Sequence, residues 1–147
     1  MPRQIRTKRV YEPAARGDGK RVLVDRLWPR GIKKSDAKLQ AWLRDLAPSD
    51  ALRRWFHEKN QPNFFPEFRK RYLRELSRLG AASALNDLYG LARSHNTVTL
   101  IYASKNDQQN NATVLRDLLN GMRKPPTSSG PARAAATGKN RARMPKS

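Results

Sequence analysis

The 147-residue chain contains no cysteine. This excludes disulfide bonds, thiolate metal sites and a cysteine nucleophile, and it suits a reducing compartment. No apolar run approaches the roughly 20 residues of a membrane-spanning helix. The first ten residues, MPRQIRTKRV, lack the apolar segment of a secretory signal. We therefore expect a cytoplasmic protein without a membrane span.

Residue patterns for metal ions and cofactors are also missing. The two histidines, His57 and His95, and the acidic residues show no spacing typical of metal ligands, so no metal site is expected. The segment RGDGK at residues 16–20 lacks the six-residue frame of a phosphate-binding loop. Nothing else in the sequence indicates a bound cofactor.

Acidic residues are few: the chain has 31 Lys and Arg, 12 Asp and Glu, and a formal net charge of +19. Seven of the basic residues and none of the acidic ones follow Met122, which leaves residues 1–122 with 24 basic residues and a net charge of +12. This excess favours a polyanionic partner such as nucleic acid or an acidic lipid. A basic protein with no such partner has the same composition.

The segment 123–147 is rich in Pro, Ser, Gly, Ala and cations, and Met144 is its one large apolar side chain. Such a segment buries too little surface to offset the entropy lost on ordering. We predict a domain over residues 1–122 followed by a disordered basic tail over residues 123–147.

Residues 1–122 alternate between patterns typical of strands and of helices. Strands are predicted over 5–10, 21–26 and 97–103, the last being an apolar run of the kind buried on both faces. The first helix is predicted over 36–46, because Leu39, Trp42, Leu43 and Leu46 share one helical face. Further helices are predicted after Ser49, from about Pro66, over about 82–94, and after an Asp107 cap.

This order of elements predicts a single α/β domain with a small, mainly parallel sheet flanked by helices. Residues 11–20 are too few and too polar for a crossover helix. The orientation of the first strand against the second therefore stays open.

Two loops follow core strands and carry polar side chains: DRLWPRG at 25–31 and YASKND at 102–107. Ligands of open α/β sheets bind outside the carboxyl ends of the strands, so the two loops share a crevice if their strands are parallel neighbours. Arg26, Arg30 and Lys105 would supply positive charge there, together with the N-terminus of the last helix.

Asp25 is a weak candidate for a catalytic base, and nearby guanidinium groups are expected to lower its pKa. An ion pair that orients the loop is the alternative role for this side chain. Trp28, which Pro29 biases toward an extended backbone, fits either a core position or a surface on which a ligand stacks.

The helix expected after Pro66 carries a basic outer face of Arg69, Lys70, Arg71, Arg74 and Arg78. This pattern is typical of a solvated face, and together with the tail it also suits nucleic-acid contact. The tail has no aromatic residue to stack on bases, so any such binding is expected to be electrostatic and independent of base sequence.

Three segments closely resemble the YeaO-like bacterial proteins of unknown function: KRVYEP at 8–13, DGKRVLVDRLWPRGIKKSDAKL at 18–39 and VTLIYASKNDQQNNATVL at 98–115. The resemblance covers residues 5–120 approximately and implies a small cytoplasmic α/β domain without assigning an activity. The family pattern is dense over residues 25–31 and again at Tyr102, Lys105 and Asn110.

The start of the last helix departs from that pattern. YeaO-like proteins usually have Asn-His there, whereas this chain has Asn110-Asn111. A wider related group carries Cys-His-Arg at this place, where this chain reads Asn110-Asn111-Ala112. No thiol nucleophile is therefore carried over, and the effect of Asn111 in place of His is left open.

We predict that the protein binds an anionic, phosphate-bearing ligand at loops 25–31 and 102–111. Whether it also catalyses a reaction, which ligand it takes and its oligomeric state are not indicated by the sequence. One alternative is a nucleic-acid-associated accessory protein that uses its basic surface and tail, and another is a partner-binding scaffold without chemistry. The predicted ligand-binding residues are Arg26, Trp28, Arg30, Tyr102, Lys105, Asn110 and Asn111.

Deleting residues 124–147 is expected to leave the folded domain intact. The deleted segment has almost nothing to pack against the domain, so the midpoint of urea unfolding and the m-value should stay nearly unchanged, because m follows the surface exposed on unfolding. A clear fall in either quantity would show that the segment packs on the domain.

Overall fold

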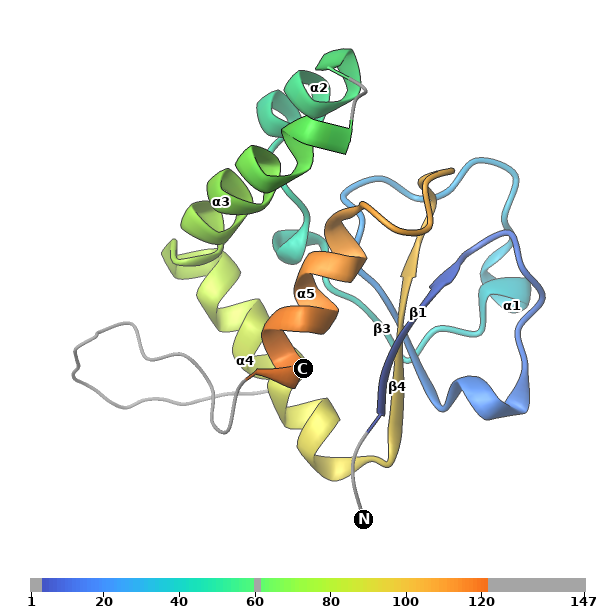
Figure 1. The fold of residues 1–147 in the computed structure, drawn as a ribbon. Coiled ribbons are helices and arrows are strands. Elements are labelled where there is room, and N and C mark those ends of the chain that lie inside the picture. The colour runs from blue at the N-terminus through green and yellow to red at the C-terminus, as the bar shows by residue number, and fades with distance from the viewer. Residues whose placement is uncertain (1–3, 60–61, 122–147) are drawn as a thin grey trace.

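In residues 4–59 and 62–121, which are the residues that the computed structural model describes, four parallel strands form one sheet (Figure 1). The segment 123–147, predicted to be a disordered tail, lies outside the described residues. The strand order is β1-β4-β2-β3. The strands are β1 (Gln4–Arg9), β2 (Lys20–Leu23), β3 (Ala41–Trp42) and β4 (Thr97–Tyr102).

The central strand is β4, and it matches the predicted 97–103 strand. Five of its six residues are buried, because β1 and β2 flank it and packed layers cover both of its faces. Ile5 pairs with Val98 on one side and Val22 pairs with Leu100 on the other, both in parallel register. The open question of orientation is thereby answered, because β1 and β2 run in the same direction on either side of β4.

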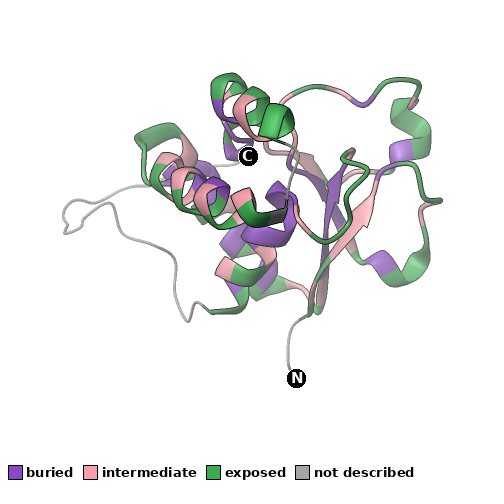
Figure 2. Cartoon of the chain, turned by 45° about the horizontal axis from the view of Figure 1, so that its top comes forward, coloured by how far each residue is buried: buried purple, intermediate pink, exposed green. Residues whose placement is uncertain are grey.

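The helices α4 (Leu79–Ser94) and α5 (Asn111–Asn120) pack on one face of the sheet, and α2 (Asp50–Lys59) and α3 (Phe65–Leu76) lie on the same side, farther from the strands (Figure 1). Alternate strand residues face them, and Val22, Leu100 and Tyr102 lie in the main core with side chains of these helices. The buried positions follow the strands and the inner sides of the helices (Figure 2).

The other face of the sheet carries a smaller core. There Val10, Leu23 and Ile101 are buried beneath the chain that runs from the end of β2 to β3 and includes the short helix α1 (Lys34–Ala37). Trp28 and Trp42 pack against these three residues. Through Trp28, this smaller core fixes the 25–31 loop against the sheet.

The predicted helix over 36–46 was wrong. The structure has only α1, after which Lys38 takes a left-handed φ of 50° and the chain becomes extended. The N–H groups of Gln40 and Leu43 donate to Arg21 and Leu23 of β2, and β3 forms between them. Leu39 and Trp42 pack on the smaller core, whereas Leu43 and Leu46 pack on the main core. The apparent helical face is therefore shared between the two faces of the sheet.

The start of α5 also differs from the prediction, because Asn110 caps the helix and Asp107 does not. The Asn110 side chain accepts from the Thr113 N–H, while the Thr113 hydroxyl oxygen accepts from the Asn110 N–H. The predicted cap at Ser49 is confirmed, since its hydroxyl accepts from the Leu52 N–H. Pro66 lies in the first turn of α3, as expected.

Replacing Gly19 by alanine is expected to destabilise the fold far more than replacing Gly31. Both glycines have a positive φ, 64° and 79°. A Cβ on Gly19 would lie 2.2 Å from the Thr97 carbonyl oxygen, whereas a Cβ on Gly31 meets no atom within 4 Å. Gly31→Ala should cost about 1 kcal/mol of unfolding free energy from backbone strain alone, and Gly19→Ala about 3 kcal/mol or more. Urea unfolding of both variants measures the difference, and equal losses would contradict the tight contact at Gly19.

Candidate functional site

The two loops singled out from the sequence meet at the carboxyl edge of the sheet. Because β2 and β4 are parallel neighbours, both loops leave the same edge. The Val24 N–H donates to the Ile101 carbonyl over 3.1 Å, and the Ala103 N–H donates to the Asp25 carboxylate over 2.9 Å. We refer to residues 25–31 and 102–111 together as the carboxyl-edge site.

Asp25 lies where these loops touch. Its second oxygen accepts from the Asn111 side-chain amide over 3.1 Å, and the same amide donates to the Val24 carbonyl over 3.0 Å. Asn111 thus joins the N-terminus of α5 to the end of β2. Burial raises the pKa of Asp25, and the hydrogen bonds from Asn111 and Ala103 oppose this only in part. The expectation of a pKa lowered by guanidinium groups was wrong, because amide groups and not arginines contact the carboxylate.

Arg26 points to the segment that precedes α2. One of its terminal nitrogens donates to the Ala47 carbonyl over a long 3.4 Å. Its Nε is buried and has no hydrogen-bond partner among the described residues. An unpartnered buried donor is uncommon in a folded protein.

Trp28 and Tyr102 are used in packing. The Trp28 indole N–H donates to the Ile32 carbonyl over 2.6 Å, and its ring meets the Trp42 ring edge-on at 5.4 Å between centroids. Trp28 is half-buried against the smaller core. Tyr102 is 2% exposed within the main core, and burial raises its pKa. Contact of either ring with a ligand stays a prediction.

The 103–110 loop is held mainly by its own side chains. The Asn106 carboxamide oxygen accepts from the N–H groups of Gln108 and Gln109, each over 2.9 Å. The Asn110 amide donates to the Asn106 carbonyl over 2.7 Å, in addition to its capping role. From β1, Arg9 donates to the Ser104 carbonyl over 2.9 Å.

Arg30 and Lys105 are the cations of the site whose charged groups are free among the described residues. Both are exposed, and neither side chain forms a hydrogen bond or an ion pair there. The Arg30 backbone carbonyl accepts from the Tyr11 hydroxyl over 3.1 Å, which ties the tip of the loop to the end of β1. Leu27, three residues before Arg30, is 67% exposed.

Two hollows lie away from this site, at the amino end of the strands. One has a volume of about 580 Å³ and is lined by Gln4, Ile5, Arg6 and Asn120. The other, of about 300 Å³, includes Arg16, Lys20 and His95 in its wall. Among the described residues, no group of three His, Asp or Glu side chains is placed to hold a metal ion. Within the same ranges, no helix has the length and apolar character needed to cross a bilayer.

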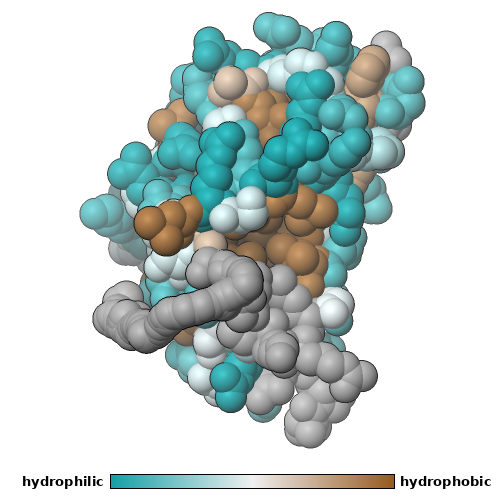
Figure 3. Space-filling view, turned by 90° about the vertical axis from the view of Figure 1, so that its left-hand side faces the viewer, coloured by the Kyte–Doolittle hydropathy of each residue, from teal (hydrophilic) through white to brown (hydrophobic). Residues whose placement is uncertain are grey.

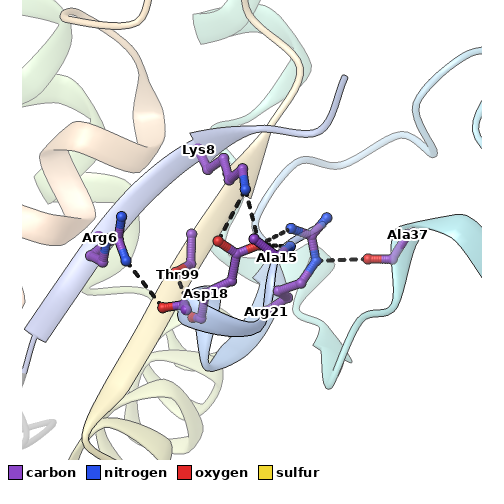
Figure 4. Close-up of polar contacts among 8 residues, drawn as sticks. Arg6, Lys8, Ala15, Asp18, Arg21, Ala37 and Thr99 are labelled. Carbon is purple, nitrogen blue, oxygen red and sulfur yellow. Dashed lines mark hydrogen bonds and ion pairs between the residues drawn. The ribbon is translucent and has the colours of Figure 1, made fainter. Parts of the chain in front are cut away.

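The amino end also contains a buried ion cluster that the sequence patterns did not reveal (Figure 4). The Asp18 carboxylate accepts from Arg21 over 2.6 Å, from Lys8 over 3.0 Å and from the Ala15 N–H over 2.9 Å. Burial raises the pKa of Asp18, but these hydrogen bonds and charges outweigh it and leave the pKa below its ordinary value. In the sequence, Lys8, Asp18 and Arg21 are charged residues in or next to predicted strands. Their spacing is not distinctive, so it could not identify the cluster.

Asp25→Asn and Asp18→Asn are expected to change the pH dependence of stability in opposite directions. Folding disfavours the charge of Asp25, so the wild type should lose stability relative to Asp25→Asn as the pH rises from the ordinary 3.8 through the raised folded-state pKa. Folding favours the charge of Asp18. Its stabilisation should be present above the ordinary 3.8 and be lost as the pH falls through the lowered folded-state pKa.

The measurement is urea unfolding of the wild type and both variants at a series of values between about pH 2 and pH 7. For each variant, the measured quantity is the difference in unfolding free energy from the wild type. If this difference changed with pH in the same direction for both variants, the environments described for Asp18 and Asp25 would be contradicted.

Comparison with known proteins places the chain in a family. The family model described as the inactive DUF488-N3 subclade matches residues 4–133, which extends past the predicted domain boundary at 122. The uncharacterized protein YeaO of Escherichia coli is 43% identical over 118 residues, which are 80% of this chain and 98% of that protein. The uncharacterized protein Rv3073c of Mycobacterium tuberculosis is also 43% identical over 118 residues, 80% of this chain and 95% of that one. No solved structure matches. The resemblance to YeaO-like proteins is confirmed, and the chain belongs to the inactive DUF488-N3 subclade, a family whose matched relatives are uncharacterised.

Proposed function

We propose that the protein binds a phosphate-bearing small molecule at the carboxyl-edge site and forms no covalent bond to it. The observation that carries this proposal is Arg26, whose buried Nε has no partner and whose terminal nitrogen has one long hydrogen bond. An anion at this edge would replace that weak arrangement with charge-assisted hydrogen bonds, which are about twice as strong as neutral ones.

The electrostatics of the edge support the proposal. Arg30 and Lys105 project from the two loops without partners among the described residues, so their charges are available to a ligand. The N-terminus of α5, a helix of ten residues, contributes the positive end of its dipole to the same place. Two carboxylates, Asp25 and Asp107, lie in the same site against the three cations Arg26, Arg30 and Lys105, so the net charge of the site stays positive.

Binding without covalent chemistry is supported by the roles of Asn110 and Asn111. These two residues stand where the wider related group carries Cys-His, and here both amides serve the fold: Asn110 caps α5 and Asn111 holds Asp25. The two histidines lie elsewhere, His57 in α2 and His95 at the end of α4. The word "inactive" in the family description agrees with this proposal.

The test is thermal unfolding of the full chain with inorganic pyrophosphate, nucleoside monophosphates and sugar phosphates. At 100 times its dissociation constant, a ligand should add about 2.7 kcal/mol to the unfolding free energy. Arg30→Gln combined with Lys105→Gln should remove most of that gain, because each charge-assisted hydrogen bond contributes about 1.5–3 kcal/mol. The matched control is Arg69→Gln combined with Lys70→Gln on α3, which removes the same charge from exposed positions and should retain the gain.

Arg26→Met provides a second arm. It keeps the length of the side chain and removes the unpartnered Nε together with the one long hydrogen bond to the Ala47 carbonyl. The unliganded protein should therefore lose little stability, while the ligand-induced gain falls. The proposal fails if none of the compounds stabilises the wild type, or if the Arg69 and Lys70 control loses the gain as fully as the Arg30 and Lys105 variant.

A further inference from the structure

The outer side of α3 presents cations that the fold does not use. Lys70 and Arg74 are four residues apart, so they lie on one side of the helix about 6 Å apart along its axis. Arg78 follows at the turn into α4, and Arg69 stands beside Lys70. All four side chains are exposed, whereas Phe68, Tyr72 and Leu76 of the same helix are buried in the main core. We call Arg69, Lys70, Arg74 and Arg78 the α3 basic face.

These four cations are available to a partner, in contrast to their basic neighbours. Among the described residues none of the four forms a hydrogen bond or an ion pair through its side chain. Arg71, by comparison, donates to Glu67 over 2.8 Å and lies 4.1 Å from the centroid of the Trp55 ring. In the same way, Arg53 and Arg54 pair with Asp50 over 2.6 and 3.2 Å.

The carboxylates near this face offset only part of its charge. Glu67 forms a hydrogen bond with Arg71 and also interacts electrostatically with Lys70 and Arg74. Glu75 accepts from the N–H and the hydroxyl of Ser49 over 2.7 and 2.6 Å. Residues 50–78 contain eight Lys and Arg and four Asp and Glu, a net charge of +4. The sequence-level prediction counted Arg71 as part of the face, and the structure shows that this residue is half-buried and already paired.

From these observations we infer that the α3 basic face binds the phosphate backbone of double-stranded DNA without reading its sequence. Phosphates follow one another every 3.4 Å along each strand of a duplex, so cations held on a rigid helix face several of them at once. In the described residues the large apolar side chains that are exposed are Tyr11, Leu27 and Leu79, so α2 and α3 offer no exposed aromatic ring on which single-stranded bases would stack.

An acidic membrane surface fits this face less well. A helix that lies in a bilayer interface needs an apolar side to insert, and the apolar side of α3 is buried in the main core. Leu79, 83% exposed, is the large apolar residue nearest to the basic face in the sequence. Seen from the α3 side, hydrophilic side chains gather over the upper part of the molecule and apolar surface shows between and below them (Figure 3).

The test measures binding of the full chain to a fluorescent duplex of about 20 base pairs by anisotropy over a range of salt concentrations. The variant carries Lys70→Gln, Arg74→Gln and Arg78→Gln. The matched control carries Arg16→Gln, Lys33→Gln and Lys34→Gln, which remove the same charge from exposed positions. Arg16 lies in the turn before β2, and Lys33 and Lys34 lie at the start of α1, which is on the other side of the sheet from α3 (Figure 1). Circular dichroism and the thermal midpoint confirm that both variants fold.

The slope of log K against log salt should become shallower by up to about 2.7 in the α3 variant, because each phosphate neutralised contributes about 0.9. The control should bind nearly as the wild type does, and two duplexes of unrelated sequence should bind alike. The inference is overturned if the wild type binds no duplex, if both variants weaken binding equally, if one duplex sequence is strongly preferred, or if the protein binds anionic phospholipid vesicles and not DNA.

Discussion

The carboxyl end of the sheet depends on one buried carboxylate. Asp25 accepts hydrogen bonds from the backbone at the end of β4 and from the first residue of α5, and its own carbonyl accepts from the Trp42 indole in β3. A single residue after β2 therefore joins three other elements, β4, α5 and β3. Burial disfavours the charge of Asp25, and the amide donors offset this only in part, so the pKa of Asp25 is raised.

Asp18, at the other end of the sheet, is a second carboxylate held inside the fold, and its charge is stabilised in a different way. Asp18 is buried, with 3% of the residue exposed, but Arg21 and Lys8 provide opposite charge and the Ala15 N–H provides a further donor. Its carbonyl accepts from the Thr99 hydroxyl, so the η1 turn (Arg16–Asp18) is fixed to β4. The Asp18 carboxylate is thus satisfied within the fold, whereas Arg30 and Lys105 at the carboxyl end are exposed to solvent.

The parts of the fold that follow from local pattern could be predicted from the sequence. The 97–103 run is apolar on both faces because β4 is central, and the cap at Ser49 needs only neighbouring residues. The helix over 36–46 could not be corrected in that way. Its apolar residues fit a helical period, and only the hydrogen bonds that Gln40 and Leu43 make to β2 decide for an extended chain. Those bonds depend on where β2 lies in space, and the sequence of residues 36–46 does not contain that information.

For the candidate site, the position of the loops could be predicted from the sequence, but the roles of their residues could not. The loops could be located because they follow core strands, and the parallel order of β2 and β4 brings them together. The roles of their residues could not be assigned, because an amide or an indole N–H serves a ligand or the fold equally well until its partner is known. Trp28, Asn110 and Asn111 have partners inside the protein, whereas Arg30 and Lys105 have none among the described residues. A motif at a strand end therefore combines residues that shape the loop with residues whose side chains have no partner in the protein. Only the second kind supports a bound ligand. At this edge Arg30 and Lys105 remain, together with the exposed carboxylate of Asp107. The three Lys and Arg of the site outnumber its two Asp, and this excess of positive charge is the physical reason for proposing an anionic ligand.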